Sequence, residues 1–458
     1  MNKSFYFLQN VDSFFRMEKE FNLFKIRNRE GFPIWDIIRY RVFHELTAEP
    51  VIVKARFIPK KGALKRILCY FISLIRFMII PLKENLFFVA SRNKTVDNNY
   101  FDQVANSAID FFPKKNISII ESYPIEGKYK YNEYMPIQFV IIEKIMTSFK
   151  RNIFLDKISE QSIINAISVF YPDKDLSPSI LNEELNTFYK RYLYYSSFFK
   201  RNKKLKRLFV TQNRIQKGLF FAAKQNNISI FEFQHGIIDR THMAYSYSDQ
   251  INYSLSDTIL PDVLFTLGKY WNDLLYNPFS RFVDIGNDHF STKLPVESTK
   301  KGITVISSLP YEIELRHFVK IIGREYSEIP IYYKLHTNQF SQFNDTIAFF
   351  SSFSNITVIT DQFSVAQLLS KTEVLITIVS TAVFEALNAG VKVFILKRMN
   401  YLILQNVLNF PGVFVIDTIQ DFEDALKAVP DTIGSDTFFT PFNKDLFLNS
   451  LDVKNASR

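Results

Sequence analysis

The segment Ser370–Leu396, SKTEVLITIVSTAVFEALNAGVKVFIL, constrains the fold of this chain more than any other. An apolar run, Val374–Val379, is followed by Ser380 and Thr381, then by a short helical pattern closed by glycine, and then by a second apolar run, Val391–Leu396. This order predicts a βαβ unit. The turn lies at the start of the predicted helix, where free N–H groups and the helix dipole attract an anion. The segment therefore predicts a phosphate site.

The same alternation of apolar runs and helical patterns extends from residue 85 to residue 430, which predicts α/β domains with parallel sheets. A chain of 458 residues is too long for one ordinary core and indicates two domains. We therefore expect two doubly wound, Rossmann-like domains. The expected boundaries are a helical N-terminal segment at 1–84, an N-terminal acceptor domain at 85–262, a C-terminal donor domain at 263–430 and a tail at 431–458.

Composition narrows the class of protein. With 47% hydrophobic and 22% charged residues, the chain is typical of globular proteins. Its one cysteine, Cys69, cannot form an internal disulfide, which favours a reducing compartment. The six histidines show no close pair with metal-ligand spacing, so we expect no metal site. We also expect a cytoplasmic location, because Met1–Asn10 lacks the apolar core and cleavage site of a signal peptide.

The net charge of +10 favours anionic partners, which include nucleic acid, anionic lipid and phosphorylated substrates. No nucleic-acid-binding motif accompanies the basic residues, so we expect lipid or nucleotide contacts and no nucleic acid; a solvated basic face fits each cluster equally well. The segment Ile67–Pro81 is apolar, carries Arg76 and is flanked by lysines. It predicts either a helix at the inner membrane surface or a buried helix.

Ligands of parallel α/β sheets bind where strands end at their carboxyl side. Five predicted strands end in polar residues. These ends are Ser91-Arg92, Gln234-His235-Gly236, Ser307-Ser308, Lys334-Leu335-His336 and Ser380-Thr381.

The end of the predicted strand at Ile228–Phe233 contains the candidate catalytic residues. A histidine followed by glycine at a strand end can lie exposed beside a ligand. His235 can take a proton from an acceptor hydroxyl, or Glu232 or Asp239 can do so or orient His235. The alternative is a structural histidine that bonds loop carbonyls. The expected neighbours on the acceptor side are Gln234, Gly236, Arg240 and His242.

The candidate donor site is in the second half of the chain. Lys334 and His336 are two residues apart on an extended segment, so both can contact a phosphate, unless they are merely solvated or capping residues. Glu385 follows Thr381 by one helical turn and can accept hydrogen bonds from ribose or sugar hydroxyls. Simple helix capping explains the hydroxyl pair and this acidic residue equally well. The full predicted set is Ser307, Ser308, Lys334, His336, Ser380, Thr381 and Glu385.

Three motifs, FEFQHG, YYKLHT and VLITIVSTAVFEALNAGVKVFIL, resemble those of GT-B glycosyltransferases that build bacterial capsule, lipopolysaccharide and other surface polysaccharides. The resemblance implies two Rossmann-like domains facing a cleft, with the donor phosphate at Ser380 and Thr381. The His-Gly pair also resembles that of polyol-phosphate transferases. Two departures stand out: Thr337 replaces the proline of a Lys-x-His-Pro motif, and Ile378-Val379 occupies the place where those transferases often have aspartate.

The expected function is transfer of a sugar from a CMP-, CDP- or UDP-linked donor to a growing surface polysaccharide or lipid-linked glycan. We expect an inverting, metal-independent reaction without a separate cofactor, at the inner membrane face. The alternatives are a CDP-polyol phosphotransferase on the same fold, a nucleotide-sugar epimerase, and a basic nucleic-acid-binding protein.

Overall fold

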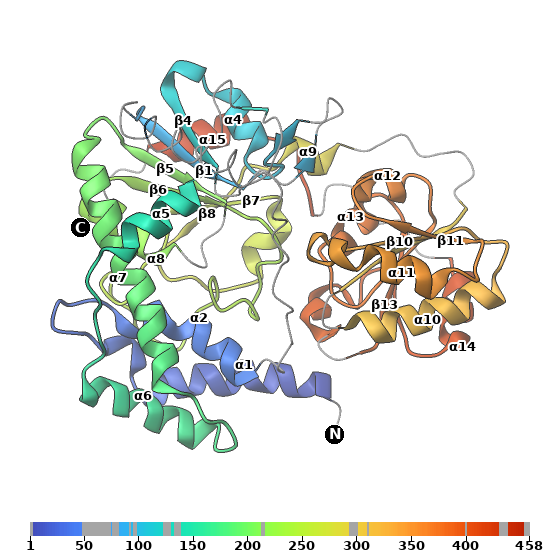
Figure 1. The fold of residues 1–458 in the computed structure, drawn as a ribbon, viewed down its shortest axis with the longest axis horizontal. Coiled ribbons are helices and arrows are strands. Elements are labelled where there is room, and N and C mark those ends of the chain that lie inside the picture. Colours follow the sequence, from blue (N-terminus) through green and yellow to red (C-terminus); the bar gives the residue numbers. More distant parts are fainter. Residues whose placement is uncertain are drawn as a thin grey trace. The chain divides into compact units, whose positions relative to one another are not determined.

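The structure is a computed structural model, drawn as a ribbon in Figure 1. It describes residues 3–47, 75, 82–90, 93–94, 99–121, 130–131, 139–211, 216–292, 301–308, 311–398, 401–429 and 438–452. The chain divides into two compact units. The first unit comprises Val11–Glu49, Ile58–His289 and Pro441–Arg458, and the second comprises Met1–Asn10, Pro50–Phe57 and Phe290–Thr440.

The first unit is built on a parallel sheet of six strands in the order β4-β1-β5-β6-β7-β8. Its inner strands consist mostly of buried apolar residues, as expected where helices cover both faces of a sheet. The strands are β1 Asn85–Val89, β4 Ile117–Glu121, β5 Arg207–Val210, β6 Ser229–Phe233, β7 Val263–Thr266 and β8 Arg281–Asp284. A separate short hairpin joins β2 Asn93–Lys94 to β3 Tyr100–Phe101.

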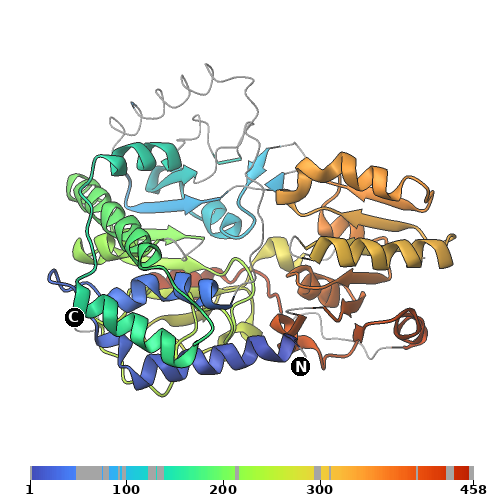
Figure 2. The same ribbon diagram turned by 60° about the horizontal axis from the view of Figure 1, so that its bottom comes forward.

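Helices surround this sheet, as a second view also shows (Figure 2). The helices that precede β9 in the chain are α1 Lys3–Glu20, α2 Ile34–Thr47, α4 Asn106–Phe111, α5 Phe139–Ser148, α6 Lys157–Phe170, α7 Pro178–Arg201, α8 Lys217–Gln225 and α9 Asp288–Ser291. The 3-10 helices of this part are η1 Leu23–Lys25, η2 Lys114–Asn116 and η3 Lys269–Asp273. The last helix, α15 Lys444–Leu451, returns to the first unit.

The second unit has its own parallel sheet of six strands, in the order β11-β10-β9-β12-β13-β14. Counted from β9, this is the order 3-2-1-4-5-6 of the Rossmann fold. The strands are β9 Ile303–Ile306, β10 Ile331–Lys334, β11 Ile356–Ile359, β12 Val374–Thr377, β13 Lys392–Leu396 and β14 Val413–Ile416. The helices are α10 Glu312–Glu325, η5 Thr337–Gln342, α11 Phe343–Phe350, α12 Val365–Leu369, α13 Ala382–Asn388, η6 Tyr401–Val407 and α14 Ile419–Lys427.

The prediction of two Rossmann-like α/β domains is confirmed, but the strands divide between the sheets differently from the predicted boundary. β7 and β8, which follow residue 262, pair with β6 and extend the first sheet. The change of sheet therefore falls between β8 and β9. The predicted tail also contributes to the first unit, because Phe447 of α15 packs within 6.1 Å of the Phe209 ring and 5.4 Å of the Phe265 ring. An apolar run alone does not tell which sheet its strand joins.

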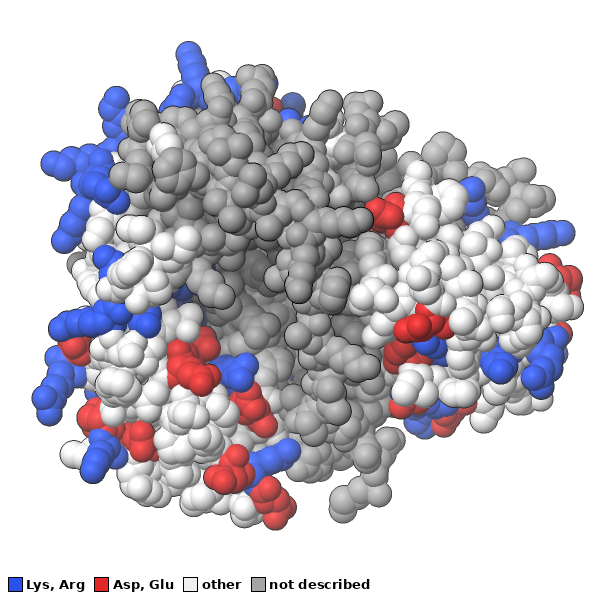
Figure 3. All heavy atoms as spheres, in the orientation of Figure 1, with Lys and Arg blue, Asp and Glu red and all other residues white. Residues whose placement is uncertain are grey.

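No helix among the described residues is long and apolar enough to cross a membrane. The predicted membrane-surface segment, Ile67–Pro81, lies outside the described residues except for Ile75. Four basic residues near the end of α7 are exposed, namely Lys200, Arg201, Lys203 and Lys204. Figure 3 shows Lys and Arg side chains gathered over part of the first unit, along the left edge of that view.

Gly218 fixes the closest approach between α7 and α8. A Cβ atom at this position would lie 2.4 Å from the Phe188 carbonyl oxygen and 2.8 Å from the Arg191 Cβ. Gly218→Ala should therefore lower the free energy of unfolding by about 1–3 kcal/mol, because the helices must move apart. Urea unfolding measures this loss, with the exposed Gln225→Ala on the same helix as control. Equal stability of the two variants would contradict so close a packing of α8 against α7.

Candidate active site

The strand order of the second sheet reverses between β9 and β12, and the carboxyl edge at such a switch point is where α/β sheets bind ligands. Two side-chain hydrogen bonds join the two strand ends there: the Ser308 hydroxyl donates to the Val379 carbonyl at 2.9 Å, and the Thr377 hydroxyl donates to the Ile306 carbonyl at 3.2 Å. Ser308 is buried, so its bond to Val379 fixes the loop that leads into α13. This edge is the first candidate site.

Ser307, the other predicted hydroxyl after β9, belongs to a buried network. Its oxygen lies 2.6 Å from Gln339 Oε1 and also bonds Glu312. Glu312 accepts further hydrogen bonds from Gln339 Nε2 at 2.6 Å, Tyr333 Oη at 3.0 Å and Arg316 Nε at 2.5 Å. The network ties the start of α10 to the end of β10. Ser307 therefore stabilises the carboxyl edge of the sheet through buried hydrogen bonds.

Lys334 ends β10, and its ammonium group is held in place by the loop after β11. Nζ donates to the Thr360 and Phe363 carbonyls, each at 2.7 Å. Burial lowers the pKa of Lys334 to about 8, although the charges of Asp361 and Glu385 oppose this change. An ammonium group has three N–H donors, and these two bonds use two of them. The third can serve an anionic ligand.

Glu385 lies one turn into α13 and is half-buried. Burial raises the pKa of its carboxyl group to about 7, and the charge of Lys334 opposes that rise. No described residue donates a hydrogen bond to this carboxyl group. Lys334 and Glu385 thus interact through their charges at the edge of one sheet, and shifted pKa values of this kind are often found at functional sites.

The remaining donor-site candidates lie on the same edge. Ser380 Oγ accepts a hydrogen bond from the Ala382 N–H at 3.2 Å, so it caps the first turn of α13, while Thr381 is exposed. His336 is also exposed, two residues beyond Lys334, and its N–H donates to Gln339 Oε1 at 3.3 Å. Within the second unit, the structure therefore brings Lys334, Glu385 and Ser380 onto the edge formed by the ends of β10 and β12.

A second candidate site lies in the first unit at the end of β6. Gln234 is buried and holds this end to β7: its Oε1 accepts from the Leu267 N–H at 3.0 Å, and its Nε2 donates to the Gly236 carbonyl at 2.9 Å. His235, between them, is exposed. Gln234 and Gly236 therefore form a rigid turn that presents the imidazole.

The predicted carboxylates near His235 are both fully buried. Glu232 accepts a hydrogen bond from Tyr245 Oη at 2.5 Å, and the same Tyr245 oxygen lies 3.2 Å from His235 Nδ1. Asp239 accepts from the Thr241 N–H at 2.8 Å and from its hydroxyl at 2.6 Å, and so shapes the loop. Tyr245 is absent from the predicted set, because nothing in the sequence indicates that a residue ten positions beyond His235 folds back onto it.

Arg240 and His242, the other predicted acceptor-side residues, point to the N-terminal helices. Arg240 forms a 2.7 Å ion pair with Asp12 of α1. The His242 ring lies 5.9 Å from the Tyr40 ring and 4.8 Å from the Tyr245 ring. His242 therefore packs beside the Tyr245–His235 contact, while Arg240 is directed elsewhere.

Arg39 of α2 braces the loop that contains Tyr245. It is buried, pairs with Glu18 through Nε at 2.7 Å, and donates to the Met243 and Ser246 carbonyls, the latter at 3.0 Å. Burial raises the pKa of Glu18, and the charge of Arg39 opposes the rise. From Val11 onward, the N-terminal helices are thus part of the first unit.

Arg39→Met should lower the free energy of unfolding by about 3–5 kcal/mol, because it leaves Glu18 as a buried charge without its partner. The double variant Glu18→Gln/Arg39→Met should recover part of that loss, because the uncompensated charge is gone. Urea unfolding of the two variants checks both statements. Equal losses would show that the pairing of the charges contributes little.

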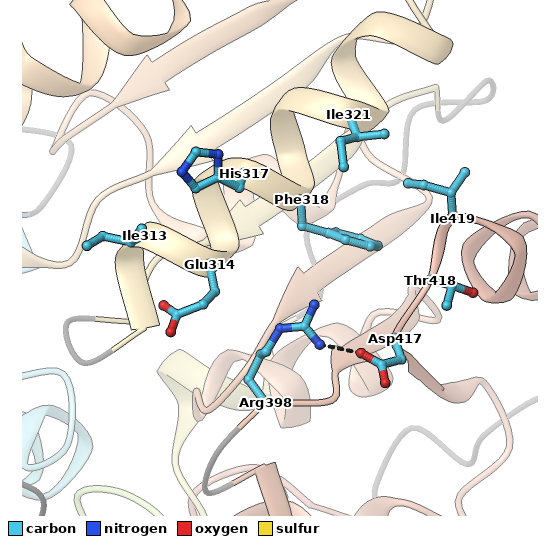
Figure 4. Close-up of a pocket in the computed structure, with 9 residues that line it drawn as sticks. All are labelled: Ile313, Glu314, His317, Phe318, Ile321, Arg398, Asp417, Thr418 and Ile419. Atoms are coloured by element: carbon cyan, nitrogen blue, oxygen red, sulfur yellow. Dashed lines mark hydrogen bonds and ion pairs between the residues drawn. The ribbon is translucent and has the colours of Figure 1, made fainter.

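The second unit also contains a hollow that the sequence did not predict, with a volume of about 360 Å³ (Figure 4). It lies between α10 and the start of α14, and the Arg398–Asp417 ion pair forms one side of it. None of the predicted donor-site residues lines it. The lining residues are Ile313, Glu314, His317, Phe318, Ile321, Arg398, Asp417, Thr418 and Ile419.

No family model matches the chain, and no curated protein sequence matches it. Several solved structures are similar to it at low sequence identity. UDP-GlcNAc 2-epimerase from Methanocaldococcus jannaschii is 11% identical over 78% of this chain and 96% of its own, with a TM-score of 0.44. MurG of Acinetobacter baumannii is 10% identical over 81% and 98%, with a TM-score of 0.35. The wall teichoic acid polymerase TagF is 11% identical over 81% and 89%, with a TM-score of 0.38. The two Rossmann-like sheets themselves are established by the strand orders given above.

Proposed function

We propose that this protein is a glycosyltransferase that moves a sugar from a nucleotide-activated donor to a surface polysaccharide or lipid-linked glycan. One observation carries the proposal. A half-buried lysine and a half-buried glutamate, Lys334 and Glu385, lie at the carboxyl edge of a sheet with Rossmann strand order. Their pKa values, about 8 and about 7, bring both groups into titration near neutral pH.

Lys334 can bind the phosphates of a nucleotide sugar, and Glu385 can bind its hydroxyl groups. The remaining N–H of Lys334 can donate to a phosphate oxygen and offset the charge that develops on the leaving nucleotide. The Ser380 and Thr381 hydroxyls precede α13 on the same edge of the sheet and can add donors. Glu385 can accept hydrogen bonds from the hydroxyls of the ribose or of the transferred sugar. The motif resemblance of this segment to donor sites supports the same assignment.

His235 is the proposed general base. In the proposed reaction the acceptor hydroxyl loses its proton to the imidazole, its oxygen bonds the anomeric carbon, and the bond from that carbon to the phosphate oxygen breaks. The electron pair leaves with the nucleotide. This displacement inverts the anomeric centre and needs no metal in the scheme we propose. Glu232 and Asp239 are too deeply buried to meet the acceptor, which favours His235 among the three candidates.

A second candidate, transfer of a polyol phosphate from a CDP-activated donor, is supported by the resemblance of the His235-Gly236 pair to that of polyol-phosphate transferases. The reaction would then take place at phosphorus, with cytidine monophosphate as the leaving group. The same His235 would accept the proton of the acceptor hydroxyl.

Product analysis separates these functions. The protein is incubated with CMP-, UDP- and GDP-sugars and with CDP-glycerol, each with and without a lipid-linked glycan acceptor, and the products are identified by mass spectrometry. We expect acceptor-dependent gain of one sugar mass. Gain of glycerol phosphate would establish the second candidate instead, and conversion of the donor sugar without any acceptor would point to an epimerase. No reaction with any donor would contradict the proposal.

A further inference from the structure

Large apolar side chains are exposed in a row beside α7 in the first unit. Phe149, Phe154 and Ile158 are 82%, 68% and 85% exposed, and Ile145 and Met146 of α5 are exposed as well. We call these residues the apolar stripe. Contiguous apolar side chains left in water cost free energy, and such a patch on a soluble protein marks a surface that binds a membrane or another protein.

Two asparagines of α7 hold the segment between α5 and α6 against that helix. The Ile153 N–H donates to Asn186 Oδ1 at 2.7 Å, and the Leu155 N–H donates to Asn182 Oδ1 at 2.9 Å. α5 itself packs on α7, beside which Figure 1 shows it. The apolar stripe therefore belongs to backbone that is fixed along α7, and its exposure is a feature of the folded surface.

Cations gather where α7 ends, at the amino edge of the first sheet. β1, β4 and β5 are paired from their first residues, so the residues that precede these strands meet at one edge. Lys83 Nζ donates to the Lys115 carbonyl at 3.0 Å, and the Leu82 N–H donates to Asn202 Oδ1 at 3.3 Å. The exposed cations of this region, which we call the basic edge, are Lys83, Lys114, Lys115, Lys200, Arg201, Lys203, Lys204 and Lys206.

The basic edge carries an excess of positive charge. Glu84 lies 3.1 Å from Lys206 and 3.2 Å from Arg207, so one carboxylate serves two cations there. Further cations lie among the residues of the apolar stripe, namely Lys150, Arg151 and Lys157. Cations at this density attract a surface of opposite charge.

The apolar stripe and the basic edge lie along the same helix. Glu143 of α5 forms an ion pair with Arg191 of α7 at 2.5 Å. α7 ends at Arg201, which is ten residues later and about 15 Å farther along the helix axis. One helix therefore presents apolar side chains along its length and cations at its end.

We propose that the apolar stripe and the basic edge together form the surface through which the first unit binds an anionic lipid bilayer. Cations at a bilayer surface are attracted to anionic headgroups, and apolar side chains beside them enter the boundary between headgroups and acyl chains. A nucleic acid would match the basic edge alone, because it offers no apolar phase to Ile145, Met146 and Ile158. This surface is independent of the proposed function, so its binding is tested without any sugar donor.

Vesicle sedimentation tests the proposal with the full-length protein. The vesicles consist of phosphatidylcholine alone or of an equimolar mixture with phosphatidylglycerol. We expect at least about tenfold stronger binding to the mixed vesicles, and weaker binding as sodium chloride is added. No binding, or equal binding to both kinds of vesicle, would overturn the proposal.

Two sets of substitutions locate the charges that bind. The first set replaces cations at the end of α7 by Lys200→Ala, Arg201→Ala, Lys203→Ala and Lys204→Ala. It should weaken binding to the mixed vesicles at least about tenfold. The control set removes the same charge from exposed positions of the second unit by Lys301→Ala, Arg324→Ala, Lys397→Ala and Lys427→Ala, and should bind as the native protein does. Equal binding by the two sets would mean that net charge, and not the basic edge, attracts the vesicles.

The apolar stripe is tested by Phe149→Gln/Phe154→Gln, whose two positions are exposed, so that the fold should be kept. We expect this double variant to bind the mixed vesicles at least about tenfold more weakly, because less apolar surface enters the bilayer. Ile313→Gln/Ile321→Gln, at exposed positions of α10, is the control. Unchanged binding of the first double variant would contradict the role of the stripe.

Fluorescence shows directly whether the stripe enters the bilayer. The native tryptophans, Trp35 and Trp271, are buried, so Phe149→Trp adds an exposed indole. We expect vesicles whose acyl chains contain bromine to quench its emission, and to leave that of Ile313→Trp unchanged. Equal emission of Phe149→Trp with brominated and ordinary vesicles would overturn the proposal. Binding to DNA or RNA without binding to vesicles would assign the basic edge to nucleic acid and overturn it as well.

Discussion

His235→Gln should lower kcat by roughly 100- to 10,000-fold, because the variant loses the group that accepts the proton of the attacking hydroxyl. The KM for the donor should change little, since His235 is in the first unit and the donor-site residues are in the second. Steady-state kinetics with saturating acceptor measures both quantities. Because His235 lies on an exposed turn, its substitution should leave the fold intact, so misfolding should not cause the loss of activity. Circular dichroism checks this directly.

The matched control is His44→Gln, which removes an exposed histidine from α2 in the same unit. We expect its kcat to stay within about twofold of the native protein. If His235→Gln retained most of the native turnover, the proton would have to go elsewhere, and the assignment of His235 as the base would be wrong. If both variants lost activity equally, the loss would reflect folding of the unit.

Glu385→Gln should make the protein less active and, at alkaline pH, more stable. The native fold raises the pKa of Glu385 from 4.5 to about 7, so folding favours the protonated carboxyl. The stability from this group is fully present below about pH 4.5 and is lost as the pH rises through 7. Full conversion of the shift would give about 3 kcal/mol, and partial solvent access reduces our expectation to about 1–2 kcal/mol. Glutamine, which does not titrate, avoids the loss.

The measurement is the urea-unfolding midpoint of Glu385→Gln and of the native protein at pH 5 and pH 8. We expect near equality at pH 5 and a higher midpoint for the variant at pH 8. The kcat/KM for the donor should fall about 10- to 100-fold, the worth of hydrogen bonds to a charged group. The control is Glu373→Gln, which changes the exposed residue immediately before β12. A midpoint difference that did not depend on pH would contradict the assigned burial of Glu385.

Much of the second unit could be predicted from the sequence because its signals are local. The apolar run, hydroxyl pair and glycine of residues 374–390 predict β12 and α13 nearly as the structure has them. Lys334 and Glu385 were each predicted as ligand contacts, but the influence of each charge on the pKa of the other group was not predicted. That influence depends on the order β10-β9-β12, which brings together residues 51 positions apart, and no local pattern encodes it.

The first unit was harder to predict, because its site depends on contacts between distant parts of the chain. The spacing of His235 and Gly236 indicates an exposed turn, and the structure has one. Asp239 was predicted as an alternative base, yet its carboxylate is buried and accepts a hydrogen bond from the Thr241 N–H. The Tyr245 contact follows from a loop whose course is fixed by Arg39, more than 200 residues away in sequence. The course of this loop depends on the burial of the charged Arg39 side chain, and a single sequence does not reveal which charged side chains are buried.

The central claim is that Lys334 and Glu385 bind a nucleotide sugar, and calorimetric titration tests it most directly. UDP-, CMP- and GDP-sugars are titrated into the native protein, into Lys334→Ala, and into Lys427→Ala, which removes an exposed cation from the far end of α14. We predict saturable binding of at least one nucleotide sugar to the native protein. Its affinity should fall at least tenfold in Lys334→Ala, because a charge-assisted hydrogen bond contributes about 1.5 kcal/mol or more. Its affinity for Lys427→Ala should equal that for the native protein. Absence of binding to every nucleotide sugar, or equal binding by the native protein and Lys334→Ala, would contradict the claim.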